Sequence, residues 1–281
     1  MFLAAAIWGF AFVAQKAGME YVGPFTFNAI RFAMGSLALL PFIKLAKIRF
    51  NESNYYSNKQ LLTGGVLAGL ILFAGASFQQ VGIVKTTAGN AGFITSLYVI
   101  MVPIFGFFWK HTTNLQTWIG AFLATIGLYF LSATERLSLS PGDGIVLISA
   151  VFFAFHVLVI GKISPRTDPI KVSIIQFTVC ALLSFIIALL TEEITWFAIK
   201  GAALPLIYGG IFSIGVAFTL QVIGQRKAKP SHTAIILSFE SLFAALGGWL
   251  FLNEGYTARG LMGCGLMLLG IVVSQINWSG R

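Results

Sequence analysis

One acidic side chain, Glu240, lies in the middle of a long apolar stretch of the sequence. A charge at the centre of a membrane-spanning helix costs roughly 2.5 to 3.5 kcal/mol on insertion scales, so an acid at such a place indicates a function unless it is paired. One such function is to take up and release a proton as water reaches or leaves the carboxyl group. The alternative interpretation is a neutral or hydrogen-bonded carboxyl group that only supports helix packing.

Arg31 and His156 are two further ionisable side chains within apolar stretches. Arg31 keeps its proton, so it must extend to a membrane surface, pair with an acid such as Glu240, or bind an anionic group. We expect a structural or charge-pairing role for Arg31. The imidazole of His156 either relays protons beside a cavity or belongs to a buried histidine whose hydrogen bonds are satisfied. His111 and His232 lie near the ends of apolar stretches, and we expect them at the interface.

Amide and aromatic side chains complete the candidate site. Gln79, Gln80 and Gln221 need partners in an apolar environment, so they either bond across helices or present donors and acceptors to a solute. We expect Tyr98 at the rim of a cavity. Trp8 lies far from the interfacial positions where tryptophan is enriched, which favours a cavity wall or gate. The predicted cavity residues are Trp8, Gln79, Gln80, Tyr98, His156, Gln221 and Glu240.

The sequence predicts no metal site and no cofactor. Its three histidines and Glu240 follow no spacing typical of metal ligands or of an activated nucleophile. Cys180 and Cys264 lie in apolar runs without a CxxC motif or a neighbouring histidine, which gives no support to a disulfide framework or a zinc site.

The composition excludes a water-soluble fold. Of the 281 residues, 57% are hydrophobic and 10% are charged, the mean hydropathy is +0.88, and soluble domains contain about 25% charged residues. Such a chain cannot cover a globule with polar side chains and must use lipid as its solvent. We therefore predict an all-α integral membrane protein.

A helix needs about 20 apolar residues to cross the bilayer core, and the sequence contains ten stretches of about that length. The loops between them are too short for a soluble domain. The predicted spans are residues 1–17, 24–43, 61–83, 87–109, 115–132, 143–162, 169–190, 203–225, 231–251 and 257–277.

Lysine and arginine set the expected orientation. With both termini in the cytoplasm, the inside loops contain twelve basic residues and the outside loops contain five, as the positive-inside rule requires. We expect a multi-pass protein of the plasma or inner membrane with cytoplasmic termini. This bias accounts for the net charge of +9, so we do not interpret the positive charge as a sign of nucleic-acid binding.

The two halves of the chain resemble each other. Trp8-Gly9 aligns with Phe153-Ala154 at an offset of 145, and Gln79 aligns with Gln221 at an offset of 142. We predict two repeats of five helices, residues 1–132 and 141–277. Since five is odd, the second repeat must enter the membrane upside down, and such inverted repeats are typical of secondary transporters with a site near the midplane.

Sequence motifs in both repeats are similar to one family of membrane proteins. The motifs are AIRF, FQQVGIVKTTAGNAGFITSLYVIMVP, WIGAFLATIGLYFL, SHTAIILSFESLFAALGGWLFLNE and GLMGCGLMLLGIVVS. Their order resembles the EamA family of the drug/metabolite transporter superfamily. The resemblance implies a ten-helix transporter of small metabolites, often amino acids or related compounds. This chain has Glu240-Ser241 where the family usually has Glu-Pro, so we expect no helix distortion there.

The leading hypothesis is a secondary transporter that moves a small organic solute by alternating access, with efflux as the expected direction and a proton as the coupling ion. The sequence lacks the GxxxxGK[ST] motif of ATP-hydrolysing proteins. One alternative is a membrane-embedded enzyme acting on a lipid or isoprenoid, and another is a sensor or assembly protein without transport. The expected partners are the solute and the bilayer, and a homodimer is left open.

Overall fold

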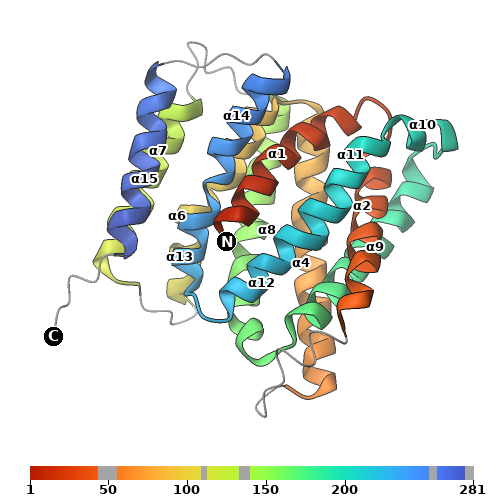
Figure 1. The fold of residues 1–281 in the computed structure, drawn as a ribbon, viewed down its shortest axis with the longest axis horizontal. Helices are drawn as coiled ribbons and strands as arrows, with labels where there is room; N and C mark the ends of the chain where they lie inside the picture. The colour runs from red at the N-terminus through yellow and green to blue at the C-terminus, as the bar shows by residue number, and fades with distance from the viewer. Residues whose placement is uncertain (44–55, 109–112, 133–139, 253–257, 276–281) are drawn as a thin grey trace.

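The computed structural model describes residues 1–43, 56–108, 113–132, 140–252 and 258–275, and within these ranges the chain forms helices and no strands (Figure 1). His111 and six of the seventeen basic loop residues that set the predicted orientation fall outside the described residues, namely Lys44, Lys47, Arg49, Lys110, Arg136 and Arg281. Every apolar stretch expected from the sequence is helical over most of its described part.

The described helices fit a multi-pass membrane protein. Seven are long and apolar enough to cross a bilayer, and three shorter apolar helices occupy the remaining expected spans. The seven are Pro24–Phe42, Asn58–Val84, Ala88–Phe108, Pro141–Arg166, Pro169–Thr191, Ala203–Gln225 and Pro230–Phe251, and the shorter three are Phe2–Gly18, Leu115–Gly127 and Gly265–Ser274. Ten crossings therefore stay a prediction, since three helices are shorter than a full span.

The first half of the chain contains α1 (Phe2–Gly18), α2 (Pro24–Leu39) with the short 3₁₀ turn η1 (Leu40–Phe42), α4 (Asn58–Val84), α5 (Ala88–Ser96), α6 (Tyr98–Phe108) and α7 (Leu115–Ser132). Side chains cap the starts of α4 and α5. The Ser57 side chain accepts from Gln60 N before α4, and the Thr87 side chain accepts from Asn90 N before α5, which satisfies backbone donors that a helix start leaves free.

The second half contains α8 (Pro141–Ile163) with η2 (Ser164–Arg166), α9 (Pro169–Thr191), α10 (Trp196–Gly201), α11 (Ala203–Ile207), the π-helix η3 (Tyr208–Phe218), α12 (Thr219–Gln225), α13 (Pro230–Leu237), α14 (Glu240–Leu252) and α15 (Ala258–Gln275). Proline opens α8, α9 and α13, where its missing N–H costs nothing. The sequence predicted neither α10 nor the π-helical middle of the span 203–225.

Two of the expected spans are broken at matching places. The first break is at Leu97, between α5 and α6, and the second is at Ser238 and Phe239, between α13 and α14. The expectation of an undistorted helix at Glu240-Ser241 is wrong. Serine hydroxyls take the place of the missing proline, because Ser238 Oγ donates to Ile235 O at 2.8 Å and Ser241 Oγ donates to Ser238 O at 2.8 Å. Such back-bonding to carbonyls bends helices.

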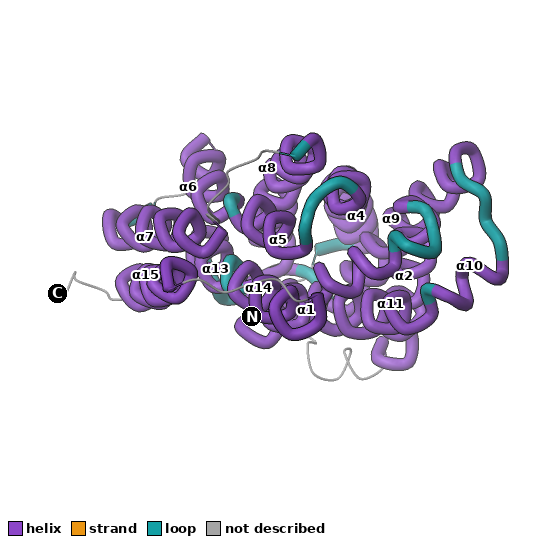
Figure 2. Tube along the Cα trace, turned by 90° about the horizontal axis from the view of Figure 1, so that it is seen from above, coloured by secondary structure: helices purple, strands orange, loops and turns teal. Residues whose placement is uncertain are grey.

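Close backbone contact joins α7 and α15, which lie side by side at one edge of the bundle, while α10 lies at the opposite edge (Figures 1 and 2). A Cβ on Gly120 would lie 2.6 Å from Gly270 O, and a Cβ on Gly270 would lie 2.6 Å from Gly120 O. A Cβ on Gly127 would lie 2.6 Å from Gly263 O. Small residues at these places allow two helices to approach closely, which is the main source of helix association in lipid.

Aromatic packing fills the centre of the bundle. The ring of Phe32 in α2 lies 6.2 Å from that of Phe177 in α9 and 6.5 Å from that of Phe218 in η3. Phe177 and Phe218 are 6.0 Å apart, and their edge-to-face arrangement is a favoured one for aromatic rings. Phe32 and Phe218 of this cluster also line the polar site described below.

Candidate functional site

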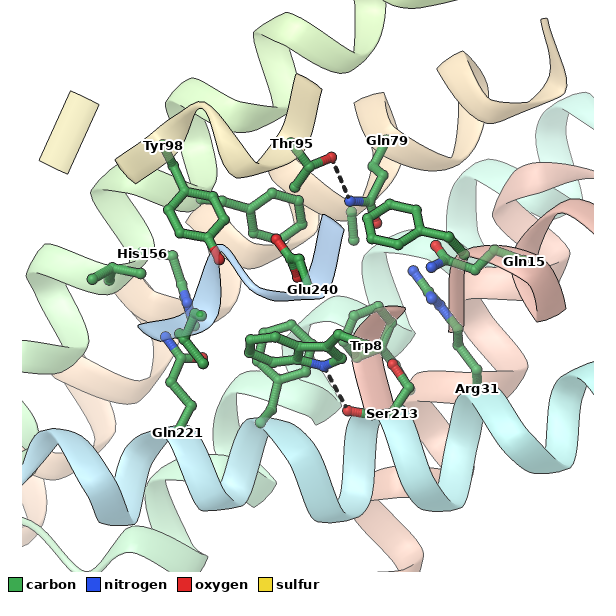
Figure 3. Close-up of a pocket in the computed structure, with 17 residues that line it drawn as sticks. Trp8, Gln15, Arg31, Gln79, Thr95, Tyr98, His156, Ser213, Gln221 and Glu240 are labelled. Atoms are coloured by element: carbon green, nitrogen blue, oxygen red, sulfur yellow. Dashed lines mark hydrogen bonds between the residues drawn. The ribbon is translucent and has the colours of Figure 1, made fainter. Parts of the chain in front are cut away.

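A central cavity collects most of the polar residues singled out from the sequence (Figure 3). It has about 530 Å³ of space free of protein atoms, the open space at its mouth included. Seven of the eight residues predicted for the cavity or for charge pairing line it, namely Trp8, Arg31, Gln79, Tyr98, His156, Gln221 and Glu240. Residues far apart in the sequence therefore meet in one place.

Glu240 enters the cavity because the helix is broken just before it. It is the first residue of α14, and its side chain is 4% exposed. Ser96 Oγ donates to Glu240 Oε1 at 3.4 Å. Within the described residues no basic side chain hydrogen-bonds this carboxyl group.

Tyr98 occupies the corresponding position in the other broken span, as the first residue of α6. It is 3% exposed, and its hydroxyl group interacts with the carboxyl group of Glu240 at a separation longer than an ordinary hydrogen bond. Figure 3 shows the hydroxyl extending into the cavity beside Glu240. The two broken spans thus place a phenol and a carboxyl group together.

Arg31 is held in the interior of the bundle. It is 3% exposed, so it does not extend to the membrane surface. Its Nε donates to Asn28 Oδ1 at 2.9 Å, and Asn28 in turn donates to Ala76 O at 3.1 Å. The guanidinium carbon lies 5.5 Å from the centre of the Phe27 ring and 5.2 Å from that of the Phe32 ring.

These contacts of Arg31 do not include an acid. Among the described residues its partners are one amide and two aromatic rings, and no ion pair joins it to Glu240, although both side chains line the cavity. The expected charge pair is therefore not present in this structure. The basic and acidic groups are separate in the cavity, and Figure 3 shows Arg31 toward one side and Glu240 near the centre, above the ring of Trp8.

Trp8 forms one wall of the cavity. Its indole Nε1 donates to Ser213 O at 3.1 Å, and its ring packs 4.5 Å from the ring of Phe218 with edge-to-face geometry. Ser213 belongs to the π-helix η3, and π-helical turns are common at functional sites. The position of the indole is therefore fixed on both its polar and its apolar side.

His156 is buried against the same aromatic wall. It is 1% exposed, its Nε2 lies 2.8 Å from Gln176 Oε1, and its ring is 5.8 Å from that of Phe218. The structure agrees with a buried, hydrogen-bonded histidine that also lines the cavity. His232 lies apart from the cavity, and its Nε2 is 3.0 Å from Thr117 Oγ1.

The three glutamines differ in their partners. Gln79 Nε2 donates to Thr95 Oγ1 at 3.1 Å, and Gln221 Nε2 donates to Gln225 Oε1 at 2.9 Å. Gln80 is not part of the cavity lining, and its Nε2 donates to Gln15 O at 3.4 Å. Neighbouring residues on a helix do not share a face, so only one of Gln79 and Gln80 reaches the cavity.

Sequence reasoning missed three polar contributors to the lining, Gln15, Thr95 and Ser213. Gln15 precedes Lys16 near the end of the predicted span 1–17, where no pattern predicted a role for it. Its buried Oε1 has no hydrogen-bond partner in the described part of the chain. Ser213 acts through its backbone carbonyl, which no side-chain pattern indicates. Within the described residues no group of histidine, cysteine and acidic side chains could hold a metal ion.

Many lining residues form pairs related by the offsets found in the sequence. Trp8 and Phe153 are separated by 145 residues, and pairs at a separation of 142 residues also line the cavity. These latter pairs are Ala76 and Phe218, Gln79 and Gln221, Thr95 and Leu237, and Tyr98 and Glu240. The cavity is thus built from equivalent positions of the two halves, while the chemistry of each pair differs.

Comparison with known proteins gives a family match over both halves of the chain. The model of the EamA-like transporter family matches residues 1–133 and 140–275. A similar protein, an uncharacterized transporter of Archaeoglobus fulgidus, is 33% identical over 277 residues, which cover 98% of this chain and 84% of that protein.

Two further relatives carry transporter names. The uncharacterized transporter YoaV of Bacillus subtilis is 24% identical, with 98% of this chain and 95% of that protein covered. The threonine/homoserine exporter RhtA of Escherichia coli is 25% identical, with 97% and 88% covered. A protein of known crystal structure superposes with a TM-score of 0.77 at 18% identity, over 98% of this chain and 94% of that one, which shows a shared fold. The chain belongs to the EamA-like transporter family of the drug/metabolite transporter superfamily, and it is a multi-pass membrane transporter.

Proposed function

We propose that this transporter exports a small zwitterionic metabolite of the amino-acid class by alternating access, in exchange for a proton. In this proposal the chain crosses the membrane ten times as two inverted five-helix repeats, residues 1–132 and 141–277, with both termini in the cytoplasm. The observation that carries the proposal is the presence of Arg31 and Glu240 in one cavity without an ion pair between them.

A zwitterion matches this separation of charges. The terminal nitrogens of Arg31 suit a carboxylate, since a guanidinium group binds carboxylates with two parallel hydrogen bonds. Glu240 suits an ammonium group, and the face of the Trp8 indole would add a cation–π contact. A substrate with both groups neutralises both buried charges at once, whereas a substrate with one group leaves the other charge uncompensated.

Paired features of the two halves support the inverted repeat. The helix breaks at Leu97 and at Ser238–Phe239 lie at equivalent positions, and broken helices near the midplane are typical of binding sites in transporters built from inverted repeats. The glycine contacts between α7 and α15 also come in equivalent pairs, Gly120 with Gly270 and Gly127 with Gly263.

Competition for Glu240 would couple the substrate to the proton. One carboxyl group can bind either a proton or the ammonium group of the substrate, so each occupant must leave before the other binds. Such competition yields exchange of a proton for a substrate molecule. His156 offers a second protonatable group in the same cavity. Export as the direction is supported by the similarity to the Escherichia coli protein named as a threonine/homoserine exporter.

Counterflow in proteoliposomes tests the substrate class. Vesicles loaded with unlabelled threonine should accumulate labelled threonine from outside, and vesicles without protein should not. An N-acetylated amino acid keeps only the carboxylate, and an amino-acid amide keeps only the ammonium group. We expect intact amino acids to compete and both derivatives to fail. Equal competition by either derivative, or no counterflow with any amino acid, would contradict the proposal.

A further inference from the structure

Gln221 presents a buried oxygen atom that lacks a partner. The side chain lines the cavity and is 1% exposed, and its Oε1 accepts no hydrogen bond from the described residues. In Figure 3 this oxygen lies on the side of the amide that faces Trp8 and Glu240, while the nitrogen lies on the other side. A buried acceptor of this kind favours a ligand that supplies a donor.

A chain of two amides fixes the orientation of Gln221. The backbone carbonyl of Val157 can only accept, so Gln225 must direct its Nε2 toward it, at 2.8 Å. Gln225 Oε1 is then the atom that accepts from Gln221 Nε2, at 2.9 Å. Gln221 therefore has to direct its Oε1 away from Gln225. Because an amide nitrogen can only donate and an amide oxygen can only accept, turning over either amide would break one of the two hydrogen bonds.

The equivalent residue of the first half is not fixed in this way. Gln79 bonds to the hydroxyl group of Thr95, and a hydroxyl group can either donate or accept. The amide of Gln79 can therefore turn over without losing its bond. Gln225 does not line the cavity, so its described contacts serve to orient Gln221.

We propose that Gln221 is a specificity-determining residue that selects substrates with a hydrogen-bond donor, such as a hydroxyl group, on the side chain. This inference rests on the proposed function, since it takes an amino acid as the substrate. With the carboxylate at Arg31 and the ammonium group at Glu240, the side chain points toward the end of the cavity formed by His156 and Gln221 (Figure 3). An apolar side chain there leaves the oxygen of Gln221 without a partner.

Three amino acids with side chains of nearly equal size separate the hydrogen-bonding roles. Homoserine has a hydroxyl group that donates and accepts, O-methylserine has an ether oxygen that only accepts, and norvaline has neither. Each is tested as a competitor of labelled threonine in counterflow by the full-length protein in proteoliposomes. Since an unsatisfied buried acceptor disfavours binding, we expect homoserine to compete about tenfold better than either analogue.

Variants of the two amides test the mechanism. Gln221→Leu should bring the three competitors to nearly equal potency. Gln225→Leu leaves Gln221 in the cavity but lets its amide turn, so O-methylserine should gain while norvaline should not. Gln79→Leu is the matched variant from the first half, and we expect the homoserine-to-norvaline ratio to persist even where the absolute rate falls.

The outcomes separate this inference from the proposed function. Transport of all three amino acids by the parent protein without a preference for homoserine would overturn the role of Gln221 and leave the zwitterion site intact. A preference that survives Gln221→Leu would also overturn it. Failure of every amino acid to compete would instead refute the proposed function and, with it, the selection by Gln221. The comparison of competitors on the parent protein decides the matter even if Gln221→Leu does not fold.

Discussion

Ser96 Oγ donates a hydrogen bond to the backbone carbonyl of Ser238 at 3.3 Å, and the two serines lie at the breaks of the two discontinuous spans, 142 residues apart. The same hydroxyl group also reaches Glu240 Oε1 at 3.4 Å. One hydroxyl group thus connects the broken helix of the first half to the broken helix and the acid of the second half. We therefore expect a change in the charge or the occupant of Glu240 to alter the hydrogen bonding at both breaks.

Loss of this hydroxyl group should slow transport. We expect Ser96→Ala to lower the rate of counterflow by about three- to tenfold, which corresponds to one hydrogen bond, while the affinity for substrate changes less. Ser77→Ala is a suitable control because Ser77 Oγ is buried and has no partner among the described residues. Equal rates for the parent and Ser96→Ala would show that the contact only supports packing.

Glu240→Gln should abolish accumulation driven by a pH gradient. The amide keeps the shape and much of the hydrogen bonding of the carboxyl group but cannot carry a proton. The measurement is uptake of labelled threonine into proteoliposomes with and without a pH gradient. Counterflow without a gradient requires only that the amide still binds the ammonium group. Glu193→Gln, at an exposed acid after α9, serves as the control. Gradient-driven accumulation by Glu240→Gln at the parental level would refute the role of Glu240 as proton carrier.

Arg31→Lys should raise the KM for substrate by about tenfold or more, because a charged hydrogen bond at a buried site is lost. Lysine keeps the charge but lacks the planar fork, the Nε donor to Asn28 and the stacking against Phe27 and Phe32. Arg31→Leu should remove binding of the carboxylate altogether. Saturation curves of counterflow measure both effects. A parental KM in Arg31→Lys would indicate that a positive charge alone is needed.

Glu192 should contribute to stability through the start of α2. Its Oε1 accepts from Phe25 N at 2.8 Å and its Oε2 accepts from Thr26 N at 2.8 Å, so it caps a helix of the first half from the second half. Glu192→Ala should destabilise the protein by about 1 kcal/mol, seen as a lower melting temperature in detergent. Gly23→Ala should act similarly, because its Cβ would lie 2.2 Å from Glu192 Cδ. Unchanged melting, as expected for the control Glu193→Ala, would argue against the cap.

Cysteines introduced at Ser57 and Glu193 should be labelled from opposite sides of the membrane. Ser57 caps the start of α4, and Glu193 follows the end of α9, and the charge bias assigns the first to the cytoplasm. A membrane-impermeant maleimide applied to intact cells should modify the cysteine at position 193 and spare the one at position 57. Labelling of both from the same side would refute the inverted topology.

The sequence predicted an all-helical chain, and seven of the ten predicted spans are helices long and apolar enough to cross a bilayer, because the length and polarity of such stretches follow from the thickness of the bilayer. It did not predict the breaks, and at the second break the local hydroxyl bonds of Ser238 and Ser241 show why. The pattern at Glu240-Ser241 lacked the proline that usually signals a distortion, while Ser238 and Ser241 supplied one by bonding to carbonyls. The π-helix Tyr208–Phe218 has the same apolar composition as an α-helix, so composition could not indicate it.

The candidate site was predictable where a polar side chain stood alone in an apolar run. Glu240, Arg31 and His156 are of this kind, and all three line the cavity. The partners of Arg31 could not be predicted, because proximity to Glu240 depends on how α2 packs against the rest of the bundle. The contact of the Ser213 backbone carbonyl with Trp8 could not be predicted, because every residue has a backbone carbonyl and no side-chain pattern marks this one.

The glycine contacts between α7 and α15 have a consequence for the origin of the molecule. Gly120 meets Gly270 and Gly127 meets Gly263, and exchanging each residue for its equivalent in the other half turns one contact into the other. An interface that is unchanged by such an exchange is the kind found between the subunits of a two-fold symmetric dimer. The interface between α7 and α15 therefore has the form expected of a dimer of two five-helix proteins inserted in opposite directions. Joining of their two genes would then have given the present chain.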